Sequence, residues 1–128
     1  MPDDMLSDVS IAALVKTLDG AALRHRALAN NIANAETPGF TRSDVAFHER
    51  LRSALERARA AGSAGAVEGV EAQVVADQES PARADGNNVD IEREMAELAK
   101  NTLEYESAVQ TLAIKLAMIR SAINEGRR

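Results

Sequence analysis

Residues 91–123 read IEREMAELAKNTLEYESAVQTLAIKLAMIRSAI, and this stretch decides the fold. Its apolar positions are separated alternately by four and three residues, the spacing that keeps side chains on one side of an α-helix. At a rise of about 1.5 Å per residue, the pattern predicts a helix about 50 Å long. The predicted seam contains Ile91, Met95, Leu98, Thr102, Tyr105, Val109, Leu112, Leu116, Ile119 and Ile123.

The charges around this stretch place its two ends. Acidic residues gather near the start, and arginines lie at or beyond the end, as the helix dipole favours. Either Asn88 or Asp90 can cap the first turn, and Gly126 marks the stop. We therefore expect a C-terminal helix over residues 89–125.

A second periodic stretch lies near the N-terminus. Its apolar positions hold a heptad spacing and predict a helix over residues 8–34. Gly20 lies inside this helix, where glycine costs about 1 kcal/mol relative to alanine. The seam positions are Ile11, Leu14, Leu18, Ala21, His25, Leu28 and Ile32.

Both seams need a partner surface, because each fully buried Leu or Ile contributes roughly 1.5–3 kcal/mol. Packing the two terminal helices as an antiparallel coiled-coil-like pair buries most of both seams. The C-terminal helix is the longer one, so part of its seam stays uncovered in a monomer. We expect that uncovered part to be a surface for other subunits.

The N-terminal helix is followed by a predicted turn over residues 35–43. Asn34 can close the helix in the left-handed conformation. Pro38 and Gly39 suit the two central positions of a type II turn, because proline fixes φ and glycine accepts a positive φ.

The middle of the chain is less regular. Residues 44–61 carry an apolar edge at Phe47, Leu51 and Leu55 and predict a short helix. Residues 62–88 lose this periodicity and are predicted to be flexible, although residues 70–76 are compatible with a short strand. The expected fold is therefore mainly α, a single domain over residues 1–128 with an irregular middle.

The composition excludes several classes of protein. The chain has no cysteine, which removes disulfide frameworks, thiol catalysis and cysteine-ligated zinc. Its net charge of −5 disfavours a general nucleic-acid binder. Residues 1–4 are acidic and no long apolar run follows, so we expect neither a cleaved signal peptide nor a membrane span.

We also expect no enzyme activity, no cofactor, no metal and no small-molecule substrate. His25 and His48 lie in different predicted elements, whereas a metal site needs several convergent ligands. Residues 85–90 resemble a calcium loop only superficially, because Val89 stands where an oxygen ligand is needed.

Four arginines lie on the predicted short helix. A basic strip on a helix can bind nucleic acid, but Glu49 and Glu56 dilute this one and no aromatic residue interleaves it. We interpret it as a solvated face or as a salt-bridging surface against a neighbouring subunit. The four residues are Arg50, Arg52, Arg57 and Arg59.

Two segments carry a family resemblance. The segment around the first turn resembles the N-terminal signature of the bacterial flagellar basal-body rod protein family. Residues 88–105 resemble the C-terminal helix of the same family, and residues 85–94 are most similar to its proximal rod proteins. Together the resemblance covers residues 15–60 and 85–124. The matching residues of the first segment are Leu28, Asn31, Ile32, Ala33, Asn34, Thr37, Pro38, Gly39 and Phe40.

The resemblance implies a structural subunit of the proximal rod in the flagellar basal body. Such proteins are exported by the flagellar type III apparatus without a cleaved signal peptide. They polymerise through their terminal helices into a periplasmic tube that transmits torque and encloses the export channel. The implied partners are further copies of the chain, FlgC-like and distal rod subunits, the adaptor FliE and the membrane ring. A free-standing helical adaptor or chaperone of an export system is the alternative.

Overall fold

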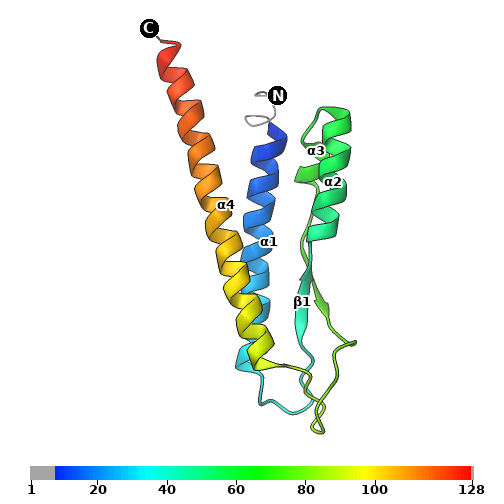
Figure 1. The fold of residues 1–128 in the computed structure, drawn as a ribbon. Helices are drawn as coiled ribbons and strands as arrows, with labels where there is room; N and C mark the ends of the chain where they lie inside the picture. Colours follow the sequence, from blue (N-terminus) through cyan, green and yellow to red (C-terminus); the bar gives the residue numbers. More distant parts are fainter. Residues whose placement is uncertain (1–7, 128) are drawn as a thin grey trace. The chain divides into compact units, whose positions relative to one another are not determined.

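The computed structural model describes residues 8–127, so the acidic residues 1–4 and Arg128 lie outside the described part. Two long helices of 26 and 35 residues make up about half of the described residues, and a small two-stranded sheet and two shorter helices lie between them in sequence (Figure 1). The elements in chain order are α1 (Asp8–Ala33), β1 (Ser43–Ala46), α2 (His48–Ala61), α3 (Gly65–Glu68), β2 (Gln73–Ala76) and α4 (Ile91–Glu125).

The described residues form two compact units, and each contains part of both long helices. Unit 1 comprises residues 8–18, 48–70 and 105–127, which include α2, α3 and the C-terminal part of α4. Unit 2 comprises residues 19–47 and 71–104, which include both strands and the N-terminal part of α4.

The two long helices agree with the predicted ranges to within two residues, and they pack against each other. In unit 2, Asn101 Nδ2 donates to the carbonyl oxygen of Ala21 at 2.9 Å. In unit 1, Lys115 Nζ donates to Ser10 Oγ at 2.9 Å. Since low numbers in α1 meet high numbers in α4, the helices run antiparallel, as predicted.

The ends of α4 show how the sequence sets its limits. Asp90 caps the first turn, because its Oδ1 accepts hydrogen bonds from the backbone N–H of Glu92 and of Arg93. This selects Asp90 over Asn88, whose side chain bonds elsewhere. The helix begins at Ile91, slightly later than predicted, and ends at Glu125, just before Gly126.

The prediction of a helix from residue 44 is wrong at its start. Residues 43–46 form β1, which pairs with β2 in antiparallel register, Val45 opposite Val74 and Ala46 opposite Gln73. The helix α2 begins only at His48. The sheet wins here because Val45 and the following Phe47 are both buried, a burial that the extended backbone allows.

The middle segment contains more structure than its sequence indicated. The expected strand is present as β2, and a one-turn helix, α3, precedes it. Val67 and Val70 are buried in unit 1, and residues 87–89 are buried in unit 2. This segment therefore contributes to the core of both units.

Gly20 is explained by the packing of unit 2. A Cβ built on this glycine would lie 2.6 Å from two carbons of the Phe47 ring. The ring therefore occupies the space that a side chain at position 20 would need, and the helix-weakening glycine permits close contact between α1 and the residue after β1.

None of the helices in the described part of the chain is both long enough and apolar enough to cross a membrane.

Candidate functional site

The two segments that carry the family resemblance meet in unit 2. Asn87 is fully buried, and its Nδ2 lies 2.9, 3.0 and 2.8 Å from the carbonyl oxygens of Asn34, Ala35 and Thr37. These carbonyls follow the last turn of α1, where backbone acceptors lose their helical partners. Arg83 Nη2 donates to the Ala35 carbonyl as well. A single asparagine, about fifty residues later in the sequence, thus caps the C-terminal end of α1.

This arrangement corrects the expected role of Asn34. No non-glycine residue in the described chain has a positive φ, so Asn34 does not close the helix in the left-handed conformation. Its Nδ2 instead donates back to Asn30 Oδ1 at 2.7 Å, while Asn87 supplies the donor that the helix end needs. The role of Asn87 in capping the C-terminal end of α1 was not predicted from the sequence.

The predicted turn at Pro38 and Gly39 is confirmed. Gly39 has a φ of 73°, and the Phe40 N–H donates to the Thr37 carbonyl at 3.3 Å, which closes the turn. The Gly39 N–H donates to the Asp85 carbonyl at 2.8 Å. A Cβ on Gly86 would approach Gly39 Cα to 3.3 Å, so two glycines with positive φ allow the two loops to touch.

We call the contact between residues 34–40 and residues 83–87 the junction, and a buried ion pair lies next to it. Glu94 in the first turns of α4 is fully buried, and its Oε1 accepts from Arg42 Nε at 2.6 Å. Its other oxygen, Oε2, accepts from Asn31 Nδ2 at 2.9 Å. The Asn31 side chain also makes two hydrogen bonds to Ser43, the first residue of β1: it donates to the Ser43 carbonyl and accepts from the Ser43 N–H. These contacts join α1, the start of the sheet and α4.

Arg42 is held from three further sides. Its Nη1 donates to Asp77 Oδ2 at 2.7 Å, and its backbone N–H donates to Asn88 Oδ1 at 2.6 Å. Asn88 Nδ2 donates in turn to the Asp77 carbonyl at 2.7 Å. Among residues 8–127, no hydrogen-bond partner reaches Nη2, although Asp44 Oδ2 lies 3.7 Å away. The cation is therefore surrounded by carboxylates rather than exposed to a ligand.

The titration of these groups follows from their partners. Burial opposes the charge of Arg42, but hydrogen bonds to Glu94 and Asp77 outweigh it and raise the pKa of Arg42 above its ordinary value. Hydrogen bonds from the Ser80 hydroxyl and from Arg42 lower the pKa of Asp77 well below its usual range. Both shifts favour the charged form of each group, so the contacts between them stabilise the ion pair.

A second arginine links the same elements. Arg24 of α1 bonds Asp44 Oδ1 at 3.1 Å through Nε and Glu97 Oε2 at 2.8 Å through Nη2. Burial raises the pKa of the Asp44 carboxyl, but hydrogen bonds from the Val45 N–H and from Arg24 outweigh it and leave that pKa lowered. The residue that contacts α4 in this turn of α1 is thus Arg24, whereas the predicted His25 is exposed.

The face of α4 that packs inside each unit differs from the predicted one. Its most buried residues recur every seven positions and are polar or small: Glu94, Asn101, Ala108 and Lys115. Four residues of the predicted seam lie one position further along the helix than this buried row: Met95, Thr102, Val109 and Leu116. The sequence does contain a signal for this buried row, namely polar residues that recur every seven positions beside the apolar stripe. A prediction from hydrophobic periodicity considers only apolar residues, so it overlooks them.

The predicted seam residues consequently fall into three groups. Leu28 and Ala21 are buried and belong to the core. Seven are half-buried: Ile11, Leu14, Leu18, Ile32, Leu98, Leu112 and Ile119. Eight are exposed: His25 on α1, and Ile91, Met95, Thr102, Tyr105, Val109, Leu116 and Ile123 on α4.

The remaining motif residues lie around the junction. Asn31 is buried, while Ile32, Asn34 and Phe40 are half-buried. The others are exposed: Ala33, Thr37, Pro38 and Gly39. Even the exposed part of the motif contacts residues 85–94, because the Thr37 carbonyl accepts from Asn87 and the Gly39 N–H donates to Asp85.

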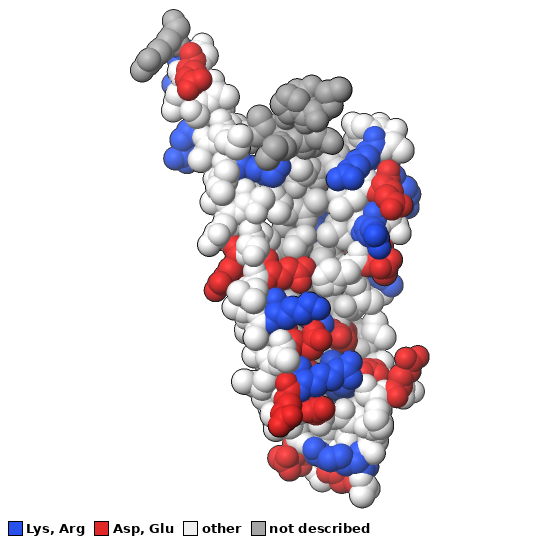
Figure 2. Space-filling view, in the orientation of Figure 1, with Lys and Arg blue, Asp and Glu red and all other residues white. Residues whose placement is uncertain are grey.

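The six exposed apolar residues of the predicted α4 seam form an apolar stripe next to the buried row of this helix. Figure 2 shows a largely uncharged surface along the C-terminal half of α4. Leu103, Ile114 and Met118 are also exposed, but they lie on a different side of the helix, because 3.6 residues make one turn. Contiguous apolar surface of this kind marks a site of protein–protein contact.

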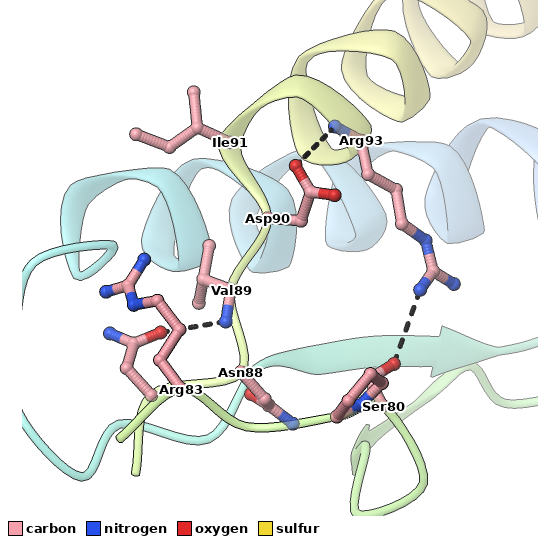
Figure 3. A pocket seen from close by; sticks show the side chains of 9 residues that line it. Ser80, Arg83, Asn88, Val89, Asp90, Ile91 and Arg93 are labelled. Carbon is pink, nitrogen blue, oxygen red and sulfur yellow. Dashed lines mark hydrogen bonds between the residues drawn. The ribbon is translucent and has the colours of Figure 1, made fainter. Parts of the chain in front are cut away.

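A pocket of about 470 Å³ opens beside the start of α4 (Figure 3). Among its lining residues, Arg93 Nη1 donates to Ser80 Oγ at 3.3 Å, and the Val89 N–H donates to Asn87 Oδ1 at 2.7 Å. The described residues contain no group of three or more His, Asp or Glu side chains placed to hold a metal ion.

Comparison with known proteins identifies this architecture. A family model described as flagella basal body rod protein matches residues 15–41, the segment that ends in the Pro38-Gly39 turn. The chain is 30% identical to the flagellar basal body rod protein FlgB of Yersinia enterocolitica over 129 aligned positions, which cover 87% of this chain and 90% of that protein. The chain belongs to the FlgB family of flagellar basal-body rod proteins.

Other members of the FlgB family match over similar lengths. FlgB of Escherichia coli strain K12 is 30% identical over 93% of this chain and 96% of its own length. FlgB of Bacillus subtilis strain 168 is 28% identical over 92% of this chain and 95% of its own length. Since these matches span nearly whole chains, the likeness includes the middle segment as well as the two motif segments.

Proposed function

We propose that this chain is a structural subunit of the rod in the flagellar basal body. The observation that carries the proposal is the exposed apolar stripe of α4 in a chain of the FlgB family. An isolated subunit leaves this stripe in water, whereas an assembled rod would bury it against neighbouring helices. The relatives give no support to the alternative of a free-standing adaptor or chaperone.

We further infer that the subunit lies in the proximal part of the rod and polymerises through α1 and α4. In such an assembly the helices would line a periplasmic tube that transmits torque and encloses the export channel. The proposed neighbours are further copies of the chain, FlgC-like and distal rod subunits, FliE and the membrane ring. Delivery would be through the flagellar type III apparatus, without a cleaved signal peptide.

The junction in unit 2 suits a torque-bearing part. Asn87 and the Arg42–Glu94 pair tie α1, β1 and α4 together through buried, directional bonds. Hydrogen bonds and ion pairs fix relative position more strictly than apolar contact does. We assign to this junction the role of keeping the two long helices in one register while neighbours pull on them.

The first test is a clean deletion of the gene, followed by imaging of the flagellar bases. We expect membrane rings that carry no rod, hook or filament. Complete rods in the deletion strain would overturn the proposal.

A substitution on the stripe tests the assembly surface. Leu116→Glu places a charge on an exposed side chain, so the isolated subunit should stay folded while assembly fails because a charge would have to be buried. Gln110→Glu, at an exposed polar position of the same helix, is the matched control. Motility equal to the control in the Leu116→Glu strain would contradict the assignment of this surface.

A further inference from the structure

The charges of the described chain are segregated between its two units. Unit 2 carries twelve acidic side chains against six basic ones, while the described part of unit 1 carries eight basic side chains against six acidic ones. The chain as a whole has a net charge of −5, so unit 2 accounts for all of the negative excess. This asymmetry suits attraction between unlike units of two molecules.

The basic side chains of unit 1 are concentrated on α2. Its core face carries Leu51, Ala54 and Ala58, and the arginines lie on either side of that face. Arg50 and Arg57 are seven residues apart, two helical turns, so they form one exposed row. Within the described residues no carboxylate pairs with either guanidinium, and Arg57 Nε reaches only the Ser53 carbonyl at 3.4 Å.

Unit 2 offers a matching surface around β2. All four residues of this strand are exposed, and Val74 and Val75 keep 53% and 49% of their surface in water. Glu71 precedes the strand and Glu79 follows it, both exposed, and no ion pair involves either carboxylate in the part of the chain described. Apolar side chains flanked by free carboxylates fit arginine, whose stem packs on apolar groups while its head binds carboxylate.

We propose that the arginine row of α2, Arg50 and Arg57, binds the β2 segment of a second copy of this chain, between Glu71 and Glu79. The contact joins unlike surfaces, so after pairing one copy still has a free β2 segment and the other still has a free arginine row. Such a heterologous contact propagates into an open assembly rather than a closed dimer. The inference rests on the proposed function, because it names one contact by which copies of the subunit add to one another.

The test measures self-association of the purified full chain by sedimentation at increasing salt. The Debye length falls from about 30 Å at 0.01 M to about 3 Å at 1 M salt, so association through these charges should weaken about tenfold or more across that range. Circular dichroism at each condition checks that the fold persists. Association that is absent at low salt, or that does not respond to salt, overturns the inference.

Two charge-reversed variants locate the contact. Arg50→Glu combined with Arg57→Glu, and separately Glu71→Lys combined with Glu79→Lys, should each reduce self-association about tenfold or more, since like charges then face each other. Mixing the two variants should restore association between them, because their reversed surfaces are again complementary. Arg50→Lys combined with Arg57→Lys keeps the charge and serves as the matched control.

If a charge-reversed variant folds poorly, the neutral variant Arg50→Gln with Arg57→Gln gives a second measurement of the same contact. The inference therefore stays falsifiable. Two folded reversed variants that do not associate when mixed would overturn it. Suppose that deletion of the gene removes the rods, but that the purified subunit associates independently of salt. This contact would then be refuted, and the proposed function would stand.

Discussion

Arg42 Nε donates to Glu94 Oε1 across 2.6 Å, and both side chains are almost fully shielded from water. The pair joins the residue before β1 to the first turns of α4, and Asn31 extends it to α1. Taking two charges out of water is costly, and their attraction offsets the cost only while both remain. The pair is therefore a specificity device more than a source of stability.

Removing one member of this pair should be strongly destabilising. Glu94→Ala leaves Arg42 buried without its main partner, so we expect the free energy of unfolding to fall by about 3–5 kcal/mol. Urea unfolding followed by circular dichroism measures it. Arg42→Met combined with Glu94→Leu removes both charges and should cost less than either single change. A double variant as unstable as the sum of the single ones would contradict this account.

Gly20→Ala should destabilise the protein, although alanine is the better helix former. Propensity alone would add about 1 kcal/mol of stability, but the new methyl group would meet the Phe47 ring at 2.6 Å. Overpacking of this kind costs about 1–3 kcal/mol. Thermal melting of Gly20→Ala, with and without Phe47→Leu, separates the two effects. If Gly20→Ala melts higher than the wild type, the Phe47 contact is looser than described.

Gly39→Val should weaken the junction through the backbone alone. In the described part of the chain no atom outside the immediate neighbours lies within 4 Å of a Cβ built on Gly39, so space is not the obstacle, but its φ of 73° disfavours a β-branched residue. We expect a loss of about 1–2 kcal/mol, the cost of the left-handed conformation for a non-glycine residue. Gly39→Asn, which tolerates that conformation better, is the control. Equal stability of the valine and asparagine variants would disprove the strain argument.

Asp77 should make stability fall in acid. The pKa of Asp77 is lowered in the folded protein from an ordinary value of 3.8, so the unfolded chain takes up the proton first as the pH falls. Its contribution is therefore fully present above about pH 4 and is lost progressively below that. Asp77→Asn lacks this contribution, so the gap between wild type and variant in free energy of unfolding should narrow towards low pH. A constant gap between pH 6 and pH 3 would show that Asp77 does not act in this way.

The two long helices could be predicted from periodicity, caps and charge placement because these signals are local. Asp90, Gly126 and the Pro38-Gly39 turn each acted within a few residues of their own position. The start of α2 could not be predicted in this way. Residues 43–46 leave the helix because β2, about thirty positions later, offers a strand to pair with, and a helix-compatible sequence carries no mark of that distant partner.

The junction itself was only half visible in the sequence. The motif around Asn31 and Gly39 indicated a turn, but the residues that complete it, Asn87 and Arg42, are ordinary polar residues when met in sequence. The phase of the α4 seam was misjudged for a related reason. Apolar side chains such as Val109 and Leu116 mark the surface left for neighbours, whereas Asn101 and Lys115 face α1.

The cap that Asn87 places on α1 has a consequence for the order in which the chain acquires structure. Any chain that has emerged only as far as residue 86 contains all of α1, yet it lacks the amide that holds the carbonyls of Asn34, Ala35 and Thr37. Contacts across so large a sequence separation form late, because the intervening chain must first be closed into a loop. A subunit that enters its destination N-terminus first would therefore have an uncapped α1 until its second half arrives, and it would complete its fold only at that point.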